Sequence, residues 1–247
     1  MKMHFVKKMG AGLLLLSLSS IVHAEFSGNV GISNNYLWRG LTQSTDEPAI
    51  SGGLDYAHES GFYIGTWASN VQYASDDSFS YEHDIYAGYA WSMGELDFDI
   101  GYLYYNYNEE ADFDFGEIYG SIGWKGFTLA AWLFTHTQDE ESNGIGVIGR
   151  EYDYDFGSTY YLSLDYGFEV PNMEGWEIGL HGGLHDGDFV DGFNFAAGIT
   201  SYIDWNASIS KGGFSFMVSG TDLDSSDTAP SLNNDDLKWV VSYSVDF

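Results

Sequence analysis

Carboxylate side chains recur at every second position of several segments, and this spacing is the feature of the sequence most able to do chemistry. Asp97 and Asp99 alternate with Phe98 and Ile100. Side chains two positions apart point to the same side of a β-strand, so the carboxylates form rows along one face. Carboxylates that ring a passage favour cations and repel anions. We therefore predict that the following residues line a narrow pore that prefers cations or neutral solutes: Asp55, Glu82, Asp84, Asp97, Asp99, Glu117, Asp165, Glu177, Asp204 and Asp246. The alternative is that they are hydrated wall residues, or pair with Lys238 and Arg39.

Hydrolysis of membrane lipid is a second chemistry to weigh. His181 and His185 share one predicted strand, and Ser163 and Asp165 share its predicted neighbour. A serine hydrolase needs a serine, a histidine base and an orienting polar group. However, no serine of the chain lies in a G-x-S-x-G motif. We therefore predict no catalytic residues, and keep a barrel enzyme acting on outer-membrane lipid as an alternative.

The elements that would position these side chains begin after an export signal. Lys2, Lys7 and Lys8 precede an apolar run that ends near Val22, and Ala24 offers a cleavage site. The run is shorter than the roughly 20 residues of a spanning helix. We expect residues 1–24 to be a cleaved signal peptide and 25–247 to be the mature protein.

The mature part alternates apolar and polar residues in segments of about ten residues, which is the pattern of strands with two unlike faces. In the last segment Leu237, Trp239 and Val241 share a face with Tyr243. We predict an all-β fold, a transmembrane antiparallel up-and-down β-barrel. Its twelve strands are expected at 26–38, 49–58, 62–71, 79–91, 95–105, 113–124, 127–135, 157–168, 175–185, 201–210, 213–221 and 237–247. In 62–71, the pair Phe62 and Ile64 competes with the pair Tyr63 and Trp67 for the outer face.

Short turns and long connections alternate strictly along the chain, as in outer-membrane barrels. Aromatic residues gather near the short turns, where an interfacial girdle would lie. A soluble β-sandwich is the competing fold. It would need a second set of apolar positions to pack across, and the opposite face here is Gly, Ser, Asn, Asp and Glu. Twelve strands imply a lumen of intermediate width.

Composition excludes other classes. The 247 residues carry a net charge of −29, which repels a phosphate backbone, so we expect no nucleic-acid partner. The chain has no cysteine, which excludes disulfides and thiolate metal sites. Acids crowd the predicted long connections, but such runs usually face water. We predict no cofactor and no metal site.

A resemblance to a known family rests on several blocks of sequence. The segment 27–44, which contains Tyr36, Trp38, Arg39 and Gly40, is similar to the opening of the TorF family of porins, as are 61–71 and the late block 201–205. The resemblance covers essentially the whole mature chain. It implies an outer-membrane β-barrel that passes small solutes, and it supplies no catalytic residues.

The C-terminus adds an expectation about assembly. Tyr243, Val245 and Phe247 resemble the terminal pattern read by the outer-membrane assembly machinery. We expect a porin-like channel in the outer membrane of a Gram-negative bacterium, in contact with lipid and lipopolysaccharide and passing small solutes, as a monomer by default. A transporter or receptor gated by the loops 136–156 and 186–200 is the second expectation.

Overall fold

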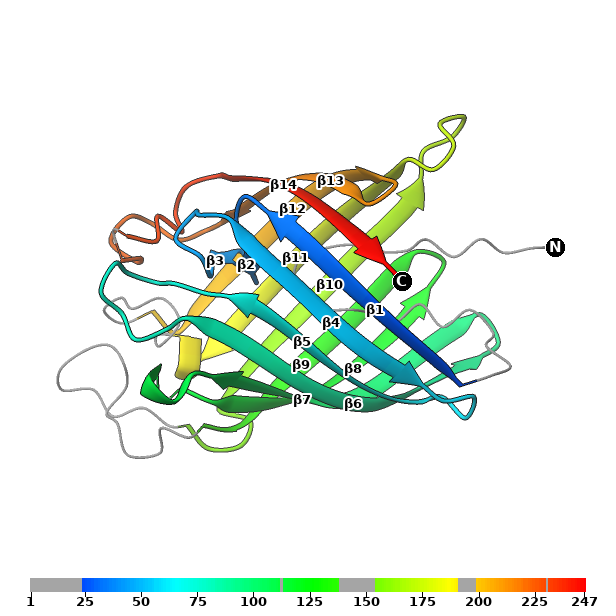
Figure 1. The fold of residues 1–247 in the computed structure, drawn as a ribbon, viewed down its shortest axis with the longest axis horizontal. Coiled ribbons are helices and arrows are strands. Elements are labelled where there is room, and N and C mark those ends of the chain that lie inside the picture. The colour runs from blue at the N-terminus through cyan, green and yellow to red at the C-terminus, as the bar shows by residue number, and fades with distance from the viewer. Residues whose placement is uncertain (1–23, 112, 138–153, 191–198, 230) are drawn as a thin grey trace.

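The computed structural model describes residues 24–111, 113–137, 154–190, 199–229 and 231–247. The predicted signal peptide lies outside the described residues, apart from Ala24. Twelve antiparallel strands close into one barrel (Figure 1). They are β1 (Glu25–Ser33), β4 (Ala49–Ala57), β5 (Phe62–Asn70), β6 (Tyr81–Met93), β7 (Leu96–Tyr107), β8 (Phe115–Trp124), β9 (Phe127–Thr137), β10 (Thr159–Glu169), β11 (Glu177–Gly187), β12 (Ser201–Lys211), β13 (Phe214–Thr221) and β14 (Lys238–Asp246).

Closure of the sheet is made by the first and last strands. β1 pairs with β4 along its whole length and with β14 from Asn29 to Ser33, where Ser33 lies opposite Ser242. Phe247 and Gly28 then exchange two backbone hydrogen bonds beyond the end of β14. A closed sheet leaves no edge strand, so the strands satisfy their backbone groups between themselves. The predicted all-β barrel of twelve strands is confirmed.

The short connections are tight turns at one end of the barrel. Lys125 and Gly126 between β8 and β9 both have positive φ, 46° and 87°. A two-residue hairpin turn of type I′ requires this backbone, because its twist matches that of the flanking strands. The long connections lie at the other end, at the left of Figure 1. Among the described residues, no helix is long and apolar enough to cross a membrane.

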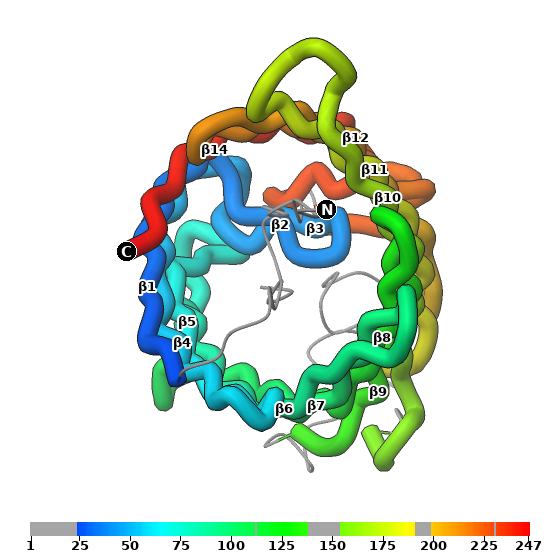
Figure 2. Tube along the Cα trace, turned by 90° about the vertical axis from the view of Figure 1, so that its right-hand side faces the viewer, coloured from blue at the N-terminus to red at the C-terminus, as the bar shows by residue number. Residues whose placement is uncertain are grey.

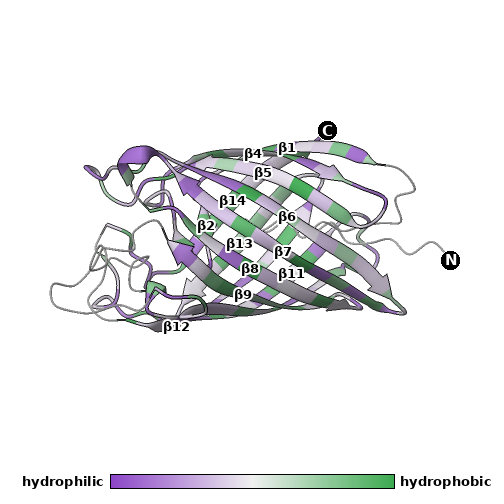
Figure 3. Ribbon diagram, turned by 90° about the horizontal axis from the view of Figure 1, so that it is seen from below, coloured by the Kyte–Doolittle hydropathy of each residue, from purple (hydrophilic) through white to green (hydrophobic). Residues whose placement is uncertain are grey.

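Hydrophobic and hydrophilic residues alternate along the strands (Figure 3), and their burial shows that the two faces of the wall differ as predicted. On β14 the apolar residues 237, 239, 241, 243, 245 and 247 are all exposed on the outside, whereas Lys238 and Val240 between them are buried inside. In β5 the competition is settled, because Phe62 and Ile64 are exposed and Tyr63 is buried. Exposed aromatics gather near the short turns: Phe26, Phe62, Tyr89, Trp91, Trp124, Phe127, Phe214 and Phe247. The exterior is therefore apolar around the whole barrel.

One predicted strand was wrong in its second half. The strand expected at 26–38 ends at Ser33. The side chain of Asn34 instead donates to the backbone carbonyl of Trp239 and accepts from the amide of Val241, which ends the pairing of β1. Residues 34–48 then turn into the barrel and form a small hairpin of β2 (Leu37–Trp38) and β3 (Leu41–Thr42). Figure 2 shows this inner hairpin inside the ring of strands.

Candidate functional site

The tip of the inner hairpin, residues 34–48, is formed by two residues with positive φ. Arg39 has φ 49° and Gly40 has φ 80°. Leu37 lies opposite Thr42 and Trp38 opposite Leu41, so Arg39 and Gly40 make the turn of the hairpin. A Cβ atom at Gly40 would lie 2.7 Å from Cβ of Asp204 on the barrel wall. Glycine is needed here both for its backbone and for the close approach of the tip to β12.

The Arg39 side chain extends from this tip into a ring of partners on the wall. Its Nη2 donates to Glu117 Oε2 at 2.6 Å, and Nη1 lies 3.1 Å from Nε2 of His185. The guanidinium carbon is 4.4 Å from the ring centre of Tyr161 and 4.1 Å from that of Trp38. Such contacts over aromatic rings stabilise a desolvated cation.

The ion pair between Arg39 and Glu117 is buried. Their side chains are only 5% and 3% exposed. Burial alone would lower the pKa of the guanidinium, but the carboxylate of Glu117 outweighs it, so the pKa of Arg39 is raised and the group stays charged. The charge of Arg39 is thus used to hold the hairpin rather than offered to a solute.

A second polar anchor holds the hairpin beside its tip. The hydroxyl of Tyr36 donates to Glu82 Oε1 at 2.7 Å, and the hydroxyl of Tyr107 donates to Oε2 at 2.7 Å. Burial raises the pKa of Tyr36, and Glu82 raises it further, so the tyrosine remains a donor. Asp84 lies two residues along β6 and its Oδ1 has no hydrogen-bond partner among the described residues.

The base of the hairpin is tied to the last strand and the connection before it. Lys238 Nζ donates to Asp46 Oδ2 at 2.7 Å and to the carbonyl of Leu232 at 2.9 Å. The amide of Thr42 donates to Asn234 Oδ1 at 3.0 Å. Lys238 and Asn234 each lie 192 positions along the chain from the hairpin residue that they contact. The hairpin and the described residues of the connection, 222–229 and 231–237, are therefore joined as one packed unit.

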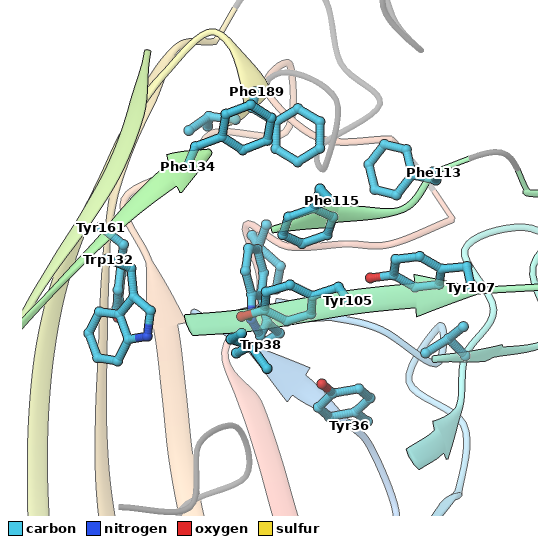
Figure 4. Packing of buried hydrophobic residues seen from close by; sticks show 14 of the residues in the cluster. Tyr36, Trp38, Tyr105, Tyr107, Phe113, Phe115, Trp132, Phe134, Tyr161 and Phe189 are labelled. Atoms are coloured by element: carbon cyan, nitrogen blue, oxygen red, sulfur yellow. The ribbon is translucent and has the colours of Figure 1, made fainter. Parts of the chain in front are cut away.

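Aromatic side chains of the wall and long connections pack beside this unit (Figure 4). Phe189 stacks on Phe113 with ring centres 5.3 Å apart, and lies 4.5 Å from Phe134 and 5.1 Å from Phe115. All four rings are buried. We call the inner hairpin and these partners the hairpin half of the interior. It is filled by packed side chains near the long connections.

The other half of the interior, near the short turns, carries a different set of residues, which we call the acidic half. Asp55 accepts from Tyr86 at 2.5 Å, and Asp99 accepts from Tyr63 at 2.7 Å. Asp97 is exposed and accepts from Ser92 at 2.6 Å. Its acids are Glu25, Asp55, Asp97, Asp99, Asp165, Glu169, Glu177 and Asp246, all on inward-facing positions of the strand ends near the short turns.

Few cations balance these acids. Of the Lys and Arg side chains that the structure describes, two belong to the hairpin half, Arg39 and Lys238. Lys125 pairs with Glu95 at a short turn. Lys211 donates to the carbonyl of Glu174 at another turn. The acidic half therefore has no Lys or Arg on the inward-facing positions of its described strands.

His181 is the basic group nearest to these acids. Its Nδ1 lies 2.9 Å from Asp165 Oδ1 and its Nε2 lies 2.9 Å from Asp204 Oδ1. Ser163 donates to Asp165 at 3.1 Å. In a serine hydrolase the histidine lies between the serine and the acid. Here the acid lies between the serine and the histidine, so the residues considered for hydrolysis are close together in a different order.

The predicted pore-lining acids are thus divided between the two halves. Glu82, Asp84, Glu117 and Asp204 are buried beside the hairpin, and the others lie in the acidic half. Their role in solute passage stays a prediction. Among the described residues, no cluster of three or more His, Asp or Glu is arranged to hold a metal ion.

The sequence predicted only part of the pairing of these acids, since Arg39 pairs with Glu117 as the alternative had it, whereas Lys238 pairs with Asp46. Tyr36, Trp38, Arg39 and Gly40 were singled out without a role, and they form the buried hairpin. Three tyrosines that reach the acids or one another went unnoticed, although the alternation places them on the polar face: Tyr63, Tyr86 and Tyr119. The last three aromatic and apolar residues of the outer face are exposed at the C-terminus, and their role in assembly stays a prediction: Tyr243, Val245 and Phe247.

Comparisons with solved structures find other barrels. A structure described as "KdgM porin" has 10% sequence identity over 90% of this chain and 98% of its own, with a TM-score of 0.49. KdgM porin in complex with disordered oligogalacturonate has 9% identity over 90% and 97%, with a TM-score of 0.46. OprD from Pseudomonas aeruginosa has 12% identity over 93% and 68%, with a TM-score of 0.42.

Comparisons of sequence place the chain in a family. No curated protein matches it. A family model described as "Bacterial protein of unknown function (Gcw_chp)" matches residues 20–244. The model carries a description other than TorF, so the TorF name stays a prediction. The match includes both the inner hairpin and the barrel strands that hold it, and the chain therefore belongs to the Gcw_chp family of bacterial proteins.

Proposed function

We propose that the protein is a narrow channel of the outer membrane for small solutes, with a preference for cations or neutral molecules. The proposal depends on one observation about the acidic half. There, carboxylates face the inside of a closed barrel, and the described strands carry no inward-facing Lys or Arg in this half. An enclosed passage lined by one sign of charge selects ions of the opposite sign.

The exterior supports the membrane part of the proposal. Apolar side chains that are exposed around the whole barrel would cost free energy in water, and lipid removes this cost. A closed sheet of antiparallel strands with short turns at one end and long connections at the other is the form that outer-membrane proteins take. We place the short turns on the periplasmic side and the long connections outside, next to lipopolysaccharide, with delivery by the assembly machinery.

The charge preference follows from the arrangement of the acids. Asp97 is exposed, and Asp165 has a side chain that is 24% exposed. Acids of this kind can meet a solute, whereas Glu117 is buried and its Oε2 accepts from both Arg39 and Tyr105. The acids of the acidic half, rather than those beside the hairpin, are expected to set the selectivity.

Planar-bilayer recording of the refolded mature protein tests the proposal. Under a salt gradient we expect small unitary currents. The sign of their reversal potential should indicate that cations pass more readily than anions. Liposome swelling with amines, sugars and carboxylic acids of similar size then reports which solutes pass. Protein-free detergent is the control. Anion preference would contradict the role of the acids, and absence of any current would contradict the channel.

A second candidate is a specific transporter whose interior opens only with its substrate. The packed hairpin half favours it, because Leu41 is fully buried and the aromatic cluster covers the adjoining wall. Such a protein would show little current until a solute binds, and its current would be blocked by an excess of that solute. Recording before and after addition of candidate solutes separates it from a permanently open channel.

A further inference from the structure

Tyrosine rings of the inner wall lie over glycines of the neighbouring strand. Tyr86 on β6 is directly opposite Gly65 on β5, which in turn is opposite Asp55 on β4. A Cβ atom at Gly65 would lie 2.5 Å from Cε2 and Cζ of Tyr86, closer than side chains approach one another, and 2.4 Å from Oδ1 of Asp55, which the Tyr86 hydroxyl contacts. The ring therefore occupies the space that a side chain at position 65 would need.

The same arrangement occurs on other parts of the wall. A Cβ atom at Gly183 on β11 would overlap the hydroxyl of Tyr161 on β10 and lie 2.5 Å from Oδ2 of Asp204 on β12. Two further tyrosines, Tyr63 on β5 and Tyr119 on β8, meet over two glycines, Gly88 and Gly101. These four residues form one row across β5, β6, β7 and β8.

Three of these four rings also reach an acid on the strand beyond, and the fourth, Tyr119, is hydrogen-bonded to Tyr63. Tyr86 donates to Asp55 at 2.5 Å, Tyr161 to Asp204 Oδ2 at 3.0 Å and Tyr63 to Asp99 at 2.7 Å. The glycine lets the ring lie along the wall, and the carboxylate holds its hydroxyl there. A hydrogen bond to a charged acceptor is stronger than one between neutral groups.

Backbone conformation does not explain these glycines. None of Gly65, Gly88, Gly101 and Gly183 is among the residues with positive φ. Any residue could adopt their extended backbone, so the requirement is for space. At Gly88 and Gly101 a Cβ would also crowd backbone oxygens, at 2.6 Å and 2.8 Å, whereas at Gly65 and Gly183 the overlaps are with side chains alone.

We propose that Gly65 is a specificity-determining residue that sets the width of the passage by allowing Tyr86 to lie flat on the wall. This inference rests on the proposed channel function. Gly183 does not share this role, because the ring of Tyr161 is buried beneath Arg39 in the hairpin half. A methyl group at position 65 turns the ring of Tyr86 away from the wall and into the lumen.

The experiment compares three variants of the refolded mature protein in planar bilayers and in liposome swelling. Gly65→Ala is expected to lose conductance and to exclude the larger amines that the wild type admits. Gly182→Ala is the control for an alanine in a strand, since a Cβ there faces outward and meets nothing within 4 Å, and it should behave as wild type. Gly65→Ala/Tyr86→Ser removes the ring and should restore conductance to at least the wild-type value.

Two outcomes overturn the inference. One is wild-type conductance and size limit in Gly65→Ala. The other is a loss in Gly65→Ala that persists in the double variant, which would show that the methyl group acts through Asp55 or through the fold and not through the ring of Tyr86. Unfolding of the same variants in detergent tests the contact between position 65 and the ring of Tyr86 independently of conductance. The loss of unfolding free energy caused by Gly65→Ala should disappear in the double variant. A wild type without conductance would instead refute the channel proposal before any variant is compared.

Discussion

The two halves of the barrel interior use the same residue types in different ways. In the hairpin half, carboxylates are buried and each oxygen of Glu82 is bound by a tyrosine, while Glu117 is bound by Arg39. In the acidic half, Asp97 is exposed, and Asp165 is reached by Ser163 and His181. A buried acid fixes structure and an accessible acid can meet solute. The difference lies in what covers the carboxylate, since both halves lie on the same alternating strands.

The strongest test of this comparison removes the cation that the hairpin half depends on. Arg39→Ala leaves the carboxylate of Glu117 buried without its partner, and breaking a buried pair in this way costs about 3–5 kcal/mol of unfolding free energy. Urea unfolding of the refolded barrel measures it. The double variant Arg39→Met/Glu117→Gln removes both charges and should recover much of the loss. A small effect of Arg39→Ala would contradict the anchor.

Release of the base of the hairpin should have an intermediate effect. Lys238→Ala removes the donor to Asp46 and to the carbonyl of Leu232, but the side chain of Asp46 is 39% exposed and can be hydrated. We expect a loss of about 1–3 kcal/mol, the usual cost of removing a partner of a buried polar group. Conductance should rise or become noisier as the hairpin loosens. Unchanged current with reduced stability would show that the hairpin does not restrict the passage.

An exposed ion pair gives the reference for these losses. Lys125 and Glu95 form a pair at 3.1 Å between two short turns, with side chains 58% and 71% exposed. Lys125→Ala should cost far less unfolding free energy than Arg39→Ala, because solvent screens such exposed pairs. Unfolding under the same conditions as Arg39→Ala gives the contrast directly. A loss as large as that of Arg39→Ala would mean that burial is not what separates the two pairs.

The smallest effect on stability, together with a clear effect on selectivity, is expected in the acidic half. Asp97→Asn changes an exposed side chain, so stability should remain within about 0.5 kcal/mol. The cation preference should fall, which the reversal potential under a salt gradient measures. Glu95→Gln at the neighbouring turn is the control for a change of net charge alone. An equal shift in both variants would assign the preference to the overall charge of the protein.

The alternation of side chains predicted most of the fold. A strand repeats every two residues, so apolar residues such as Trp239 and Val241 indicate the outer face without any knowledge of their neighbours. The same rule placed Asp97 and Asp99 on the inside. Strand ends were predicted to within a few residues, except where β1 ends at Ser33, because Tyr36 and Trp38 continue the alternation within a different structure.

By itself the sequence determined the number of strands, their two faces and the end of the barrel where the short turns lie, because these depend on local spacing and on turn residues such as Gly126. Only the tertiary structure decided that residues 34–48 fold into the interior, that Arg39 meets Glu117 across 78 positions, and that Tyr86 lies over Gly65. Contacts of this kind depend on which strands become neighbours when the sheet closes, and no local pattern records that choice.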